Sequence, residues 1–199
     1  MELFSALLLF AFSSTITPGP NNIMIMASGM NYGVQRSLPH FFGICIGFPT
    51  MVIAIGLGLG AVFTWMPVLH DVIKVLGIIY LLYLAWKIAS AETASLYSKK
   101  TDPFTFIQGA LFQWVNPKAW IMGMGAVATF TSQSLNIYAQ VGLIAAIFLL
   151  VAFPCVGMWL VFGSKVRGLL SQPKQQKIFN VCMAILLVLS IAPVAFEYI

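Results

Sequence analysis

Two short polar patches interrupt otherwise apolar stretches of this sequence, and they contain its most informative side chains. The first patch is the run Thr17-Pro18-Gly19-Pro20-Asn21-Asn22. The second patch is the run Asn116-Pro117-Lys118, which follows Gln113. Proline lacks a backbone N–H and its ring clashes with the carbonyl four residues earlier, so a helix that enters either patch must break or kink. In lipid such irregular backbone survives only where it is buried in protein or lines a wet cavity.

The prolines also predict how the chain resumes a helix after each patch. Proline is favoured as the first residue of a helix, so new helices are expected to begin at Pro20 and Pro117. The N–H groups at these helix starts would attract an anion. The carbonyls freed upstream, at Ser14, Ile16 and Gln113, would attract a cation or an ammonium group. An amino acid in its zwitterionic form carries both charges a few ångströms apart, which favours it as the ligand.

The side chains of the two patches add further binding groups. A lysine in the middle of a membrane costs about 3 kcal/mol, so Lys118 is expected to face a cavity or a partner. In the alternative interpretation the prolines and asparagines only kink and pack the helices, and Lys118 snorkels to the interface. The occurrence of two related patches favours a binding function, without catalytic or metal-binding residues. The predicted substrate-binding residues are Thr17, Pro18, Gly19, Pro20, Asn21, Asn22, Gln113, Asn116, Pro117 and Lys118.

The composition indicates the environment in which these patches lie. Of the 199 residues 60% are hydrophobic and only 8% are charged, with a mean hydropathy of +0.96, whereas soluble domains carry about 25% charged residues. The sequence therefore predicts an all-α integral membrane protein, surrounded by lipid. The net charge of +5 is not accompanied by a nucleic-acid-binding motif, so no nucleic-acid partner is predicted.

A helix needs about 20 residues to cross the hydrocarbon core, and the apolar runs reach that length six times. The predicted spans are Leu3–Ala27, Phe41–Phe63, Val68–Ala89, Phe106–Phe130, Ile137–Phe162 and Ile178–Phe196. The acidic start at Glu2 favours a retained first span over a signal peptide. Because the connectors are too short for a soluble domain, residues 1–199 are expected to form one membrane domain.

Basic residues predict the orientation of these spans, since cytoplasmic loops are enriched in Lys and Arg. Those in or beside the connectors after the first, third and fifth spans are Arg36, Lys87, Lys99, Lys100, Lys165, Arg167, Lys174 and Lys177. Only Lys74 belongs to the opposite side, and Lys118 lies within a span. The asymmetry places these connectors in the cytoplasm and both termini outside it.

The order of features suggests an internal repeat, with halves at about 1–89 and 105–199. A polar patch broken by proline lies in the first span of each half, and the second spans carry Phe48-Pro49 and Phe153-Pro154. Because three spans is an odd number, the second half must insert upside down relative to the first. The predicted fold is thus two inverted three-helix repeats, the arrangement of many secondary transporters. We expect Gly43 and Gly47 to allow close helix packing.

Two other classes of function were weighed against a transporter of amino acids. An exporter of metal or inorganic ions would need converging carboxylate, His or Cys ligands. All five acidic residues lie at or outside the span ends, and the three cysteines lie in separate apolar runs where burial is expected. A membrane-embedded enzyme is disfavoured because His40 and His70 belong to opposite sides of the predicted membrane. No cofactor is predicted.

The sequence resembles the LysE/RhtB family of bacterial amino-acid exporters over nearly its full length. The matching segments are Thr17–Asn22, Gly33–Gly47, Leu76–Lys87, Phe106–Ala110 and Asn116–Lys118. The resemblance implies a six-span protein of the bacterial inner membrane that exports amino acids or close derivatives and is driven by the proton gradient. Within the family, the doubled Asn21-Asn22 and the run Ala85–Ala89 resemble the cysteine/O-acetylserine exporters. A homo-oligomer is compatible with the sequence.

Overall fold

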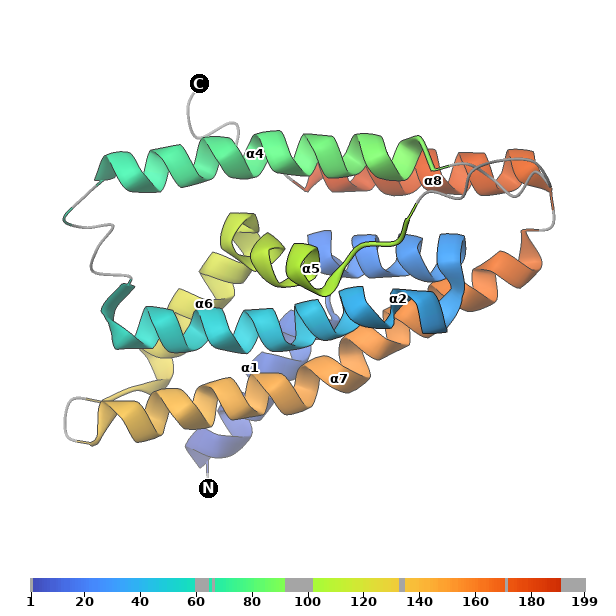
Figure 1. Ribbon diagram of the computed structural model, residues 1–199. Coiled ribbons are helices and arrows are strands. Elements are labelled where there is room, and N and C mark those ends of the chain that lie inside the picture. Colours follow the sequence, from blue (N-terminus) through green and yellow to red (C-terminus); the bar gives the residue numbers. More distant parts are fainter. Residues whose placement is uncertain are drawn as a thin grey trace.

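The computed structural model describes residues 2–59, 65, 67–91, 102–132, 135–170 and 172–190, and their regular elements are helices (Figure 1). The α-helices are α1 (Glu2–Ile16), α2 (Pro20–Ala54), α4 (Pro67–Ala89), α5 (Phe106–Phe112), α6 (Pro117–Phe130), α7 (Ile137–Leu169) and α8 (Pro173–Leu189). A π-helical turn, Ile55–Leu59, continues α2, and a 3-10 turn, Gln113–Val115, continues α5. The predicted all-helical class is confirmed.

Helix α2 consists of two arms that reverse direction at Gly33 (Figure 1). Gly33 has φ 78° and ψ 175°, outside the helical region and favourable for glycine. In a straight helix Ser28 and His40 would lie about 18 Å apart, yet the Ser28 hydroxyl lies 2.9 Å from Nδ1 of His40. We call residues 20–32 the first arm of α2 and residues 34–54 its second arm.

Both polar patches interrupt helices, and the predicted restarts at Pro20 and Pro117 are confirmed. Helix α1 ends at Ile16 and α2 begins at Pro20, while the 3-10 turn ends at Val115 and α6 begins at Pro117. The first break is followed by the second arm of α2 and by α4, and the second break is followed by α7 and α8.

Several predicted boundaries were wrong. The connector expected between Ala27 and Phe41 is helical on both sides of Gly33. Helix α7 continues to Leu169, and α8 begins at Pro173. These ends carry polar residues, which can extend beyond the hydrocarbon as helix and so escape a prediction based on apolar runs. The predicted ends at Phe63 and Phe196 lie outside the described residues.

Two helical segments in the described part of the chain are long and apolar enough to cross a membrane by length and composition. They are Pro20–Leu59, with a mean hydropathy of 2.1, and Ile137–Leu169, with 2.6. Helix α1 and the segment Val75–Ala89 are shorter apolar helices. These elements are consistent with a membrane protein.

Glycines allow the central helices to approach at backbone distance. A Cβ atom at Gly29 would overlap the carbonyl oxygen of Leu160, and one at Gly163 would overlap that of Met26, so the first arm of α2 lies directly against α7. A Cβ at Gly47 would lie 2.6 Å from Cα of Ala110 on α5. The expectation of close packing at Gly47 is confirmed, and Gly43 lies equally close to the start of α5.

The basic residues of the described connectors gather at one end of the bundle. The reversal at Gly33, the end of α4, the end of α7 and the start of α8 all lie there (Figure 1). Contacts agree with this view, because Nζ of Lys177 donates to the Ala89 carbonyl at 2.8 Å and the Arg167 guanidinium lies beside Gly33. Lys99 and Lys100 lie outside the described residues. We call this the basic end.

The contact between α2 and α7 predicts a difference between two glycines of α7. Gly163→Ala places a methyl group against the Met26 backbone, which cannot move cheaply, so we expect a loss of about 1–3 kcal/mol in unfolding free energy. Gly142→Ala is the matched control, because a Cβ there meets no atom within 4 Å, and alanine favours the helix by up to about 1 kcal/mol. Unfolding in detergent measures both. Equal stability of the two variants would contradict the close contact.

Candidate functional site

The first break leaves the start of α2 open. Gly19 is extended, with φ −174° and ψ −179°, and precedes Pro20 without a side-chain cap among the described residues. The first backbone bond into the helix joins the Ile23 N–H to the Gly19 carbonyl at 2.9 Å. The N–H groups of the first turn therefore keep their capacity to bind an anion, which the helix dipole reinforces.

The carbonyls freed at this break are paired by side chains from elsewhere. Asn22 Nδ2 donates to the carbonyl oxygens of Thr15, at 3.0 Å, and Thr17, at 2.9 Å. The indole N–H of Trp159, on α7, donates to the Ile16 carbonyl at 3.1 Å. The carbonyls of Thr15, Ile16 and Thr17 are thus satisfied inside the protein, as an apolar environment demands.

Lys118, the second residue of α6, supplies a further donor at the first break. Its Nζ donates to the Thr17 carbonyl at 2.7 Å and lies 3.5 Å from the Pro18 carbonyl. A Cβ at Gly19 would lie 2.8 Å from Cδ of Lys118, so glycine is needed here for close approach rather than for an unusual φ. The protein's own ammonium group thus lies against carbonyls of the first break, although at Thr17 and Pro18 rather than at the predicted Ser14, Ile16 and Gln113.

The second break is closed by its own residues. Asn116 is extended, with φ −89° and ψ 109°, and its side-chain oxygen caps α6 by accepting from the Lys118 N–H at 3.1 Å. The Asn116 N–H donates to the Gln113 carbonyl at 3.3 Å. The indole N–H of Trp120 donates to the Trp114 carbonyl at 2.9 Å. The start of α6 is therefore capped, whereas the start of α2 is not.

A pair of amides joins the two breaks across 92 positions of sequence. Asn21 Nδ2 donates to Oε1 of Gln113 at 2.8 Å, and Gln113 Nε2 donates back to Oδ1 of Asn21 at 3.0 Å. Gln113 is fully buried and also donates to the Gly109 carbonyl at 2.9 Å. This reciprocal pair ties the start of α2 to the 3-10 turn before α6.

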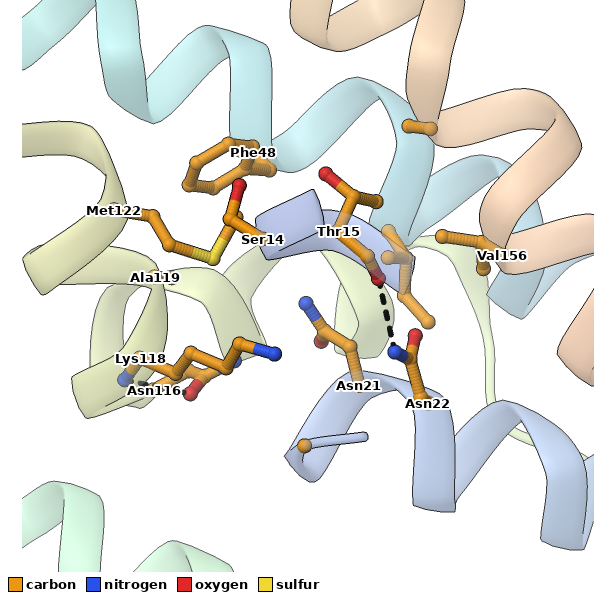
Figure 2. Close-up of a pocket in the computed structure, with 13 residues that line it drawn as sticks. Ser14, Thr15, Asn21, Asn22, Phe48, Asn116, Lys118, Ala119, Met122 and Val156 are labelled. Atoms are coloured by element: carbon orange, nitrogen blue, oxygen red, sulfur yellow. Dashed lines mark hydrogen bonds between the residues drawn. The ribbon is translucent and has the colours of Figure 1, made fainter. Parts of the chain in front are cut away.

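A cavity of about 40 Å³ lies between the two breaks (Figure 2), enough for more than one water molecule. Its polar wall consists of Ser14, Thr15, Gly19, Asn21, Asn22, Asn116 and Lys118. Its apolar wall includes Phe48, Met122 and Val156. In Figure 2 the Lys118 side chain extends toward Asn21. The Thr15 hydroxyl is buried without a hydrogen-bond partner among the described residues.

The cavity has a one-sided electrostatic character. Lys118 contributes a cation and the uncapped start of α2 adds partial positive charge, while no carboxylate is among its lining residues. In the described part of the chain no group of three or more His, Cys, Asp or Glu side chains is placed to hold a metal ion. The arrangement therefore suits the carboxylate of an organic ligand better than a metal cation.

The structure places the predicted site residues in three roles. Gly19, Asn21, Asn22, Asn116 and Lys118 line the cavity. The carbonyls of Thr17 and Pro18 lie against the Lys118 ammonium group, and Gln113 is paired with Asn21. Pro20 and Pro117 begin the two helices that meet there.

Sequence reasoning missed part of the cavity wall. Ser14 and Thr15 directly precede the first patch, and the hydroxyl run that they form with Ser13 in an apolar helix was a usable signal. Phe48 and Met122 gave no such signal, because an apolar residue in an apolar helix is uninformative about what it faces. Of the cysteines, Cys45 and Cys155 are buried as expected, whereas Cys182 is exposed.

Comparison with known proteins identifies the family. The cysteine/O-acetylserine efflux protein of Escherichia coli (strain K12) is 28% identical over 94% of both chains, and that of Klebsiella pneumoniae is 34% identical over 64% of this chain and 65% of its own. No solved structure gave a significant match. The sequence profile of the LysE type translocators matches residues 12–193. The chain therefore belongs to the LysE type translocator family, whose members are transporters rather than enzymes.

Proposed function

We propose that this protein exports an amino acid or a close derivative across the bacterial inner membrane, by alternating access around the two helix breaks. The observation that carries the proposal is the cavity between the breaks, where Lys118 and the uncapped start of α2 lie beside the amides of Asn21 and Asn116. The names of the relatives support amino acids as the substrate class, and cysteine and O-acetylserine are the first candidates.

The proposed membrane architecture has six spans in one domain. Helix α1 with the first arm of α2, the second arm of α2, and α4 form the first half. Helices α5 and α6, then α7, and then α8 form the second half. The matching order of an interrupted helix, a long helix and a third helix supports the repeat, and the odd number of spans per half makes the two halves inverted.

The site can bind both charges of an amino acid if Lys118 changes its partner. The substrate carboxylate would be held by the Lys118 ammonium group and by the first-turn N–H groups of α2. The carbonyls of Thr17 and Pro18, which Lys118 now occupies, would then be free for the substrate's ammonium group. The Thr15 hydroxyl and the amide of Asn21 would bind polar groups near the α-carbon or on the side chain.

This exchange of partners gives the substrate a way to change the conformation. Lys118 belongs to α6 and the carbonyls that it binds lie in the break between α1 and α2, so its contact holds two interrupted helices together. The amide pair of Asn21 and Gln113 holds them at a second point. A ligand that draws Lys118 away favours conformations in which these helices separate, because a ligand shifts an equilibrium by its differential affinity.

A panel of amino acids tests the proposed activity. We expect cells that express the protein to accumulate at least one amino acid or derivative in the medium, with cysteine and O-acetylserine tested first. Collapse of the proton gradient is expected to stop the export. The controls are cells with an empty vector and the same cells expressing a known amino-acid exporter. If the known exporter raises extracellular amino acids and this protein raises none, the proposed function is wrong.

Substitutions in the cavity test the site. Lys118→Met and Asn21→Ala are expected to reduce export at least about tenfold, because a hydrogen bond to a charged group contributes about 1.5–3 kcal/mol and ~1.4 kcal/mol corresponds to tenfold. Lys174→Met is the matched control, since Lys174 is exposed near the start of α8. Membrane insertion and monodispersity in detergent are measured for each variant. Normal export by both cavity variants would exclude this cavity as the substrate site.

Reporter fusions test the orientation. We expect green fluorescent protein fused after Lys174 to fluoresce, and alkaline phosphatase fused there to be inactive, because the basic end should face the cytoplasm. The reverse result is expected for fusions after Asn136, which caps the opposite end of α7. The opposite pattern would invert the topology, and equal signals from both positions would contradict the proposed span between them.

A further inference from the structure

A second group of buried polar side chains lies between the two arms of α2, toward the basic end. The imidazole of His40 and the hydroxyl of Ser28 are almost completely buried, and Nδ1 of His40 lies 2.9 Å from Oγ of Ser28. Nε2 of His40 has no hydrogen-bond partner among the described residues. Ser28 lies about 10 Å along the helix from Asn21, and neither Ser28 nor His40 lines the cavity described above.

A small second cavity, of about 10 Å³, adjoins this pair and has room for about one water molecule. Ser28, Asn31, Tyr32, Lys87 and Phe104 are among its lining residues. The His40 ring lies behind this wall, with its centroid 5.0 Å from that of Phe104. The Ser28 hydroxyl therefore contacts both the cavity and the imidazole, and it can relay a proton between them because a hydroxyl both donates and accepts.

The charged groups around His40 come from several elements and are mostly cationic. Lys87, on α4, lies over the Phe104 ring, with Nζ 4.5 Å from the ring centroid. Arg36 lies on α2 near the Tyr32 ring, and Arg167 approaches Gly33 from α7. Lys177, on α8, is bonded to the Ala89 carbonyl. Asp102, which is exposed and lies just before α5, is an acidic residue at the basic end of the bundle.

Coupling to a proton gradient requires a group inside the membrane that gains and loses a proton. The five acidic residues, Glu2, Asp71, Glu92, Asp102 and Glu197, are absent from the middle of the predicted spans. Histidine is the side chain that changes charge most readily near neutral pH. His40 is buried within a helix pair, and one of its ring nitrogens is unused.

We propose that His40 is the proton-binding residue that couples transport to the proton gradient, with Ser28 as its positioning and relay partner; this inference rests on the proposed exporter function. A hydronium ion in the small cavity gives a proton to the Ser28 hydroxyl while that hydroxyl passes its own proton to Nδ1 of His40. The hydroxyl is thus re-formed, and the resulting imidazolium donates its Nδ1–H to Ser28. The proton returns to water on the other side when the imidazole becomes neutral again.

Burial links this proton to a conformational change. An imidazolium without a counter-charge is costly in an apolar interior, and Ser28 is neutral. Protonated His40 therefore favours a conformation in which the two arms of α2 open to water at the basic end, and neutral His40 favours the closed packing. The movement would reach the first cavity directly, because Asn21 and Ser28 lie on the same arm.

An experiment with reconstituted protein distinguishes proton-coupled transport from substrate exchange that needs no proton gradient. Purified protein is placed in liposomes with an acidic lumen, and two rates are measured with the amino acid that the panel identifies: gradient-driven uptake, and exchange of labelled for unlabelled substrate without a gradient. We expect His40→Asn to lose gradient-driven uptake and substrate-dependent proton efflux, reported by a pH-sensitive dye, while exchange continues. Asparagine can still hydrogen-bond Ser28 but does not titrate. His70→Asn, which changes the other histidine, is expected to keep both activities.

Two further outcomes are decisive. Retained proton efflux and gradient-driven uptake in His40→Asn would overturn the proposal, and so would loss of exchange together with uptake, which would make His40 structural. Ser28→Ala is expected to keep exchange but shift the pH at which coupled uptake is half-maximal; an unchanged pH profile would remove Ser28 from the relay. If the wild-type protein transports no amino acid in either assay, the proposed exporter function fails independently of His40.

Discussion

The need to pair backbone carbonyls at the break between α1 and α2 organises this structure. Two prolines within three residues remove helical donors, and an apolar surrounding offers no water to replace them. The donors come instead from Asn22, from Trp159 on α7 and from Lys118 on α6. Each of these bonds fixes one more helix against the break. The break that interrupts the helix therefore also places the Lys118 ammonium group, the Asn22 amide and the open start of α2 around one cavity.

The two breaks differ in whether a side chain caps the helix that follows, and this difference leaves partial positive charge on one side of the cavity. Asn116 caps the helix that begins at Pro117, so the second break is complete without a ligand. Gly19 has no side chain, so the helix that begins at Pro20 keeps unsatisfied donors and leaves space for Lys118. Of the two similar interruptions, one therefore leaves an open helix start and the other forms a closed cap that holds the lysine in place. Glycines elsewhere, at positions 29 and 163, keep α2 and α7 close enough to support this arrangement.

The sequence was most informative where a residue type restricts the backbone locally. Proline chemistry was sufficient to predict both breaks and the helix starts at Pro20 and Pro117. The pairing of Asn21 with Gln113, and of Lys118 with the Thr17 carbonyl, could not be predicted, because such pairs depend on how helices about 100 positions apart pack together. The sequence predicted a reversal between Ala27 and Phe41 but not its form: the residues around Gly33 form helix on both sides, so neither composition nor hydropathy marks a turn of one residue.

The position of Lys118 also addresses the energetic difficulty of an empty binding site in a membrane. A lysine facing an apolar cavity without a partner would be costly to bury, and freed carbonyls without donors would be costly as well. Each satisfies the other in the structure described here. A ligand with a single negative charge would draw Lys118 away, so that the Pro18 carbonyl loses its donor while the Thr17 carbonyl keeps its bond from Asn22, whereas a zwitterion would supply a replacement for both partners of Lys118. This arrangement is the reason for the amino-acid substrate proposed above, and it is the same pairing that stabilises the broken helix.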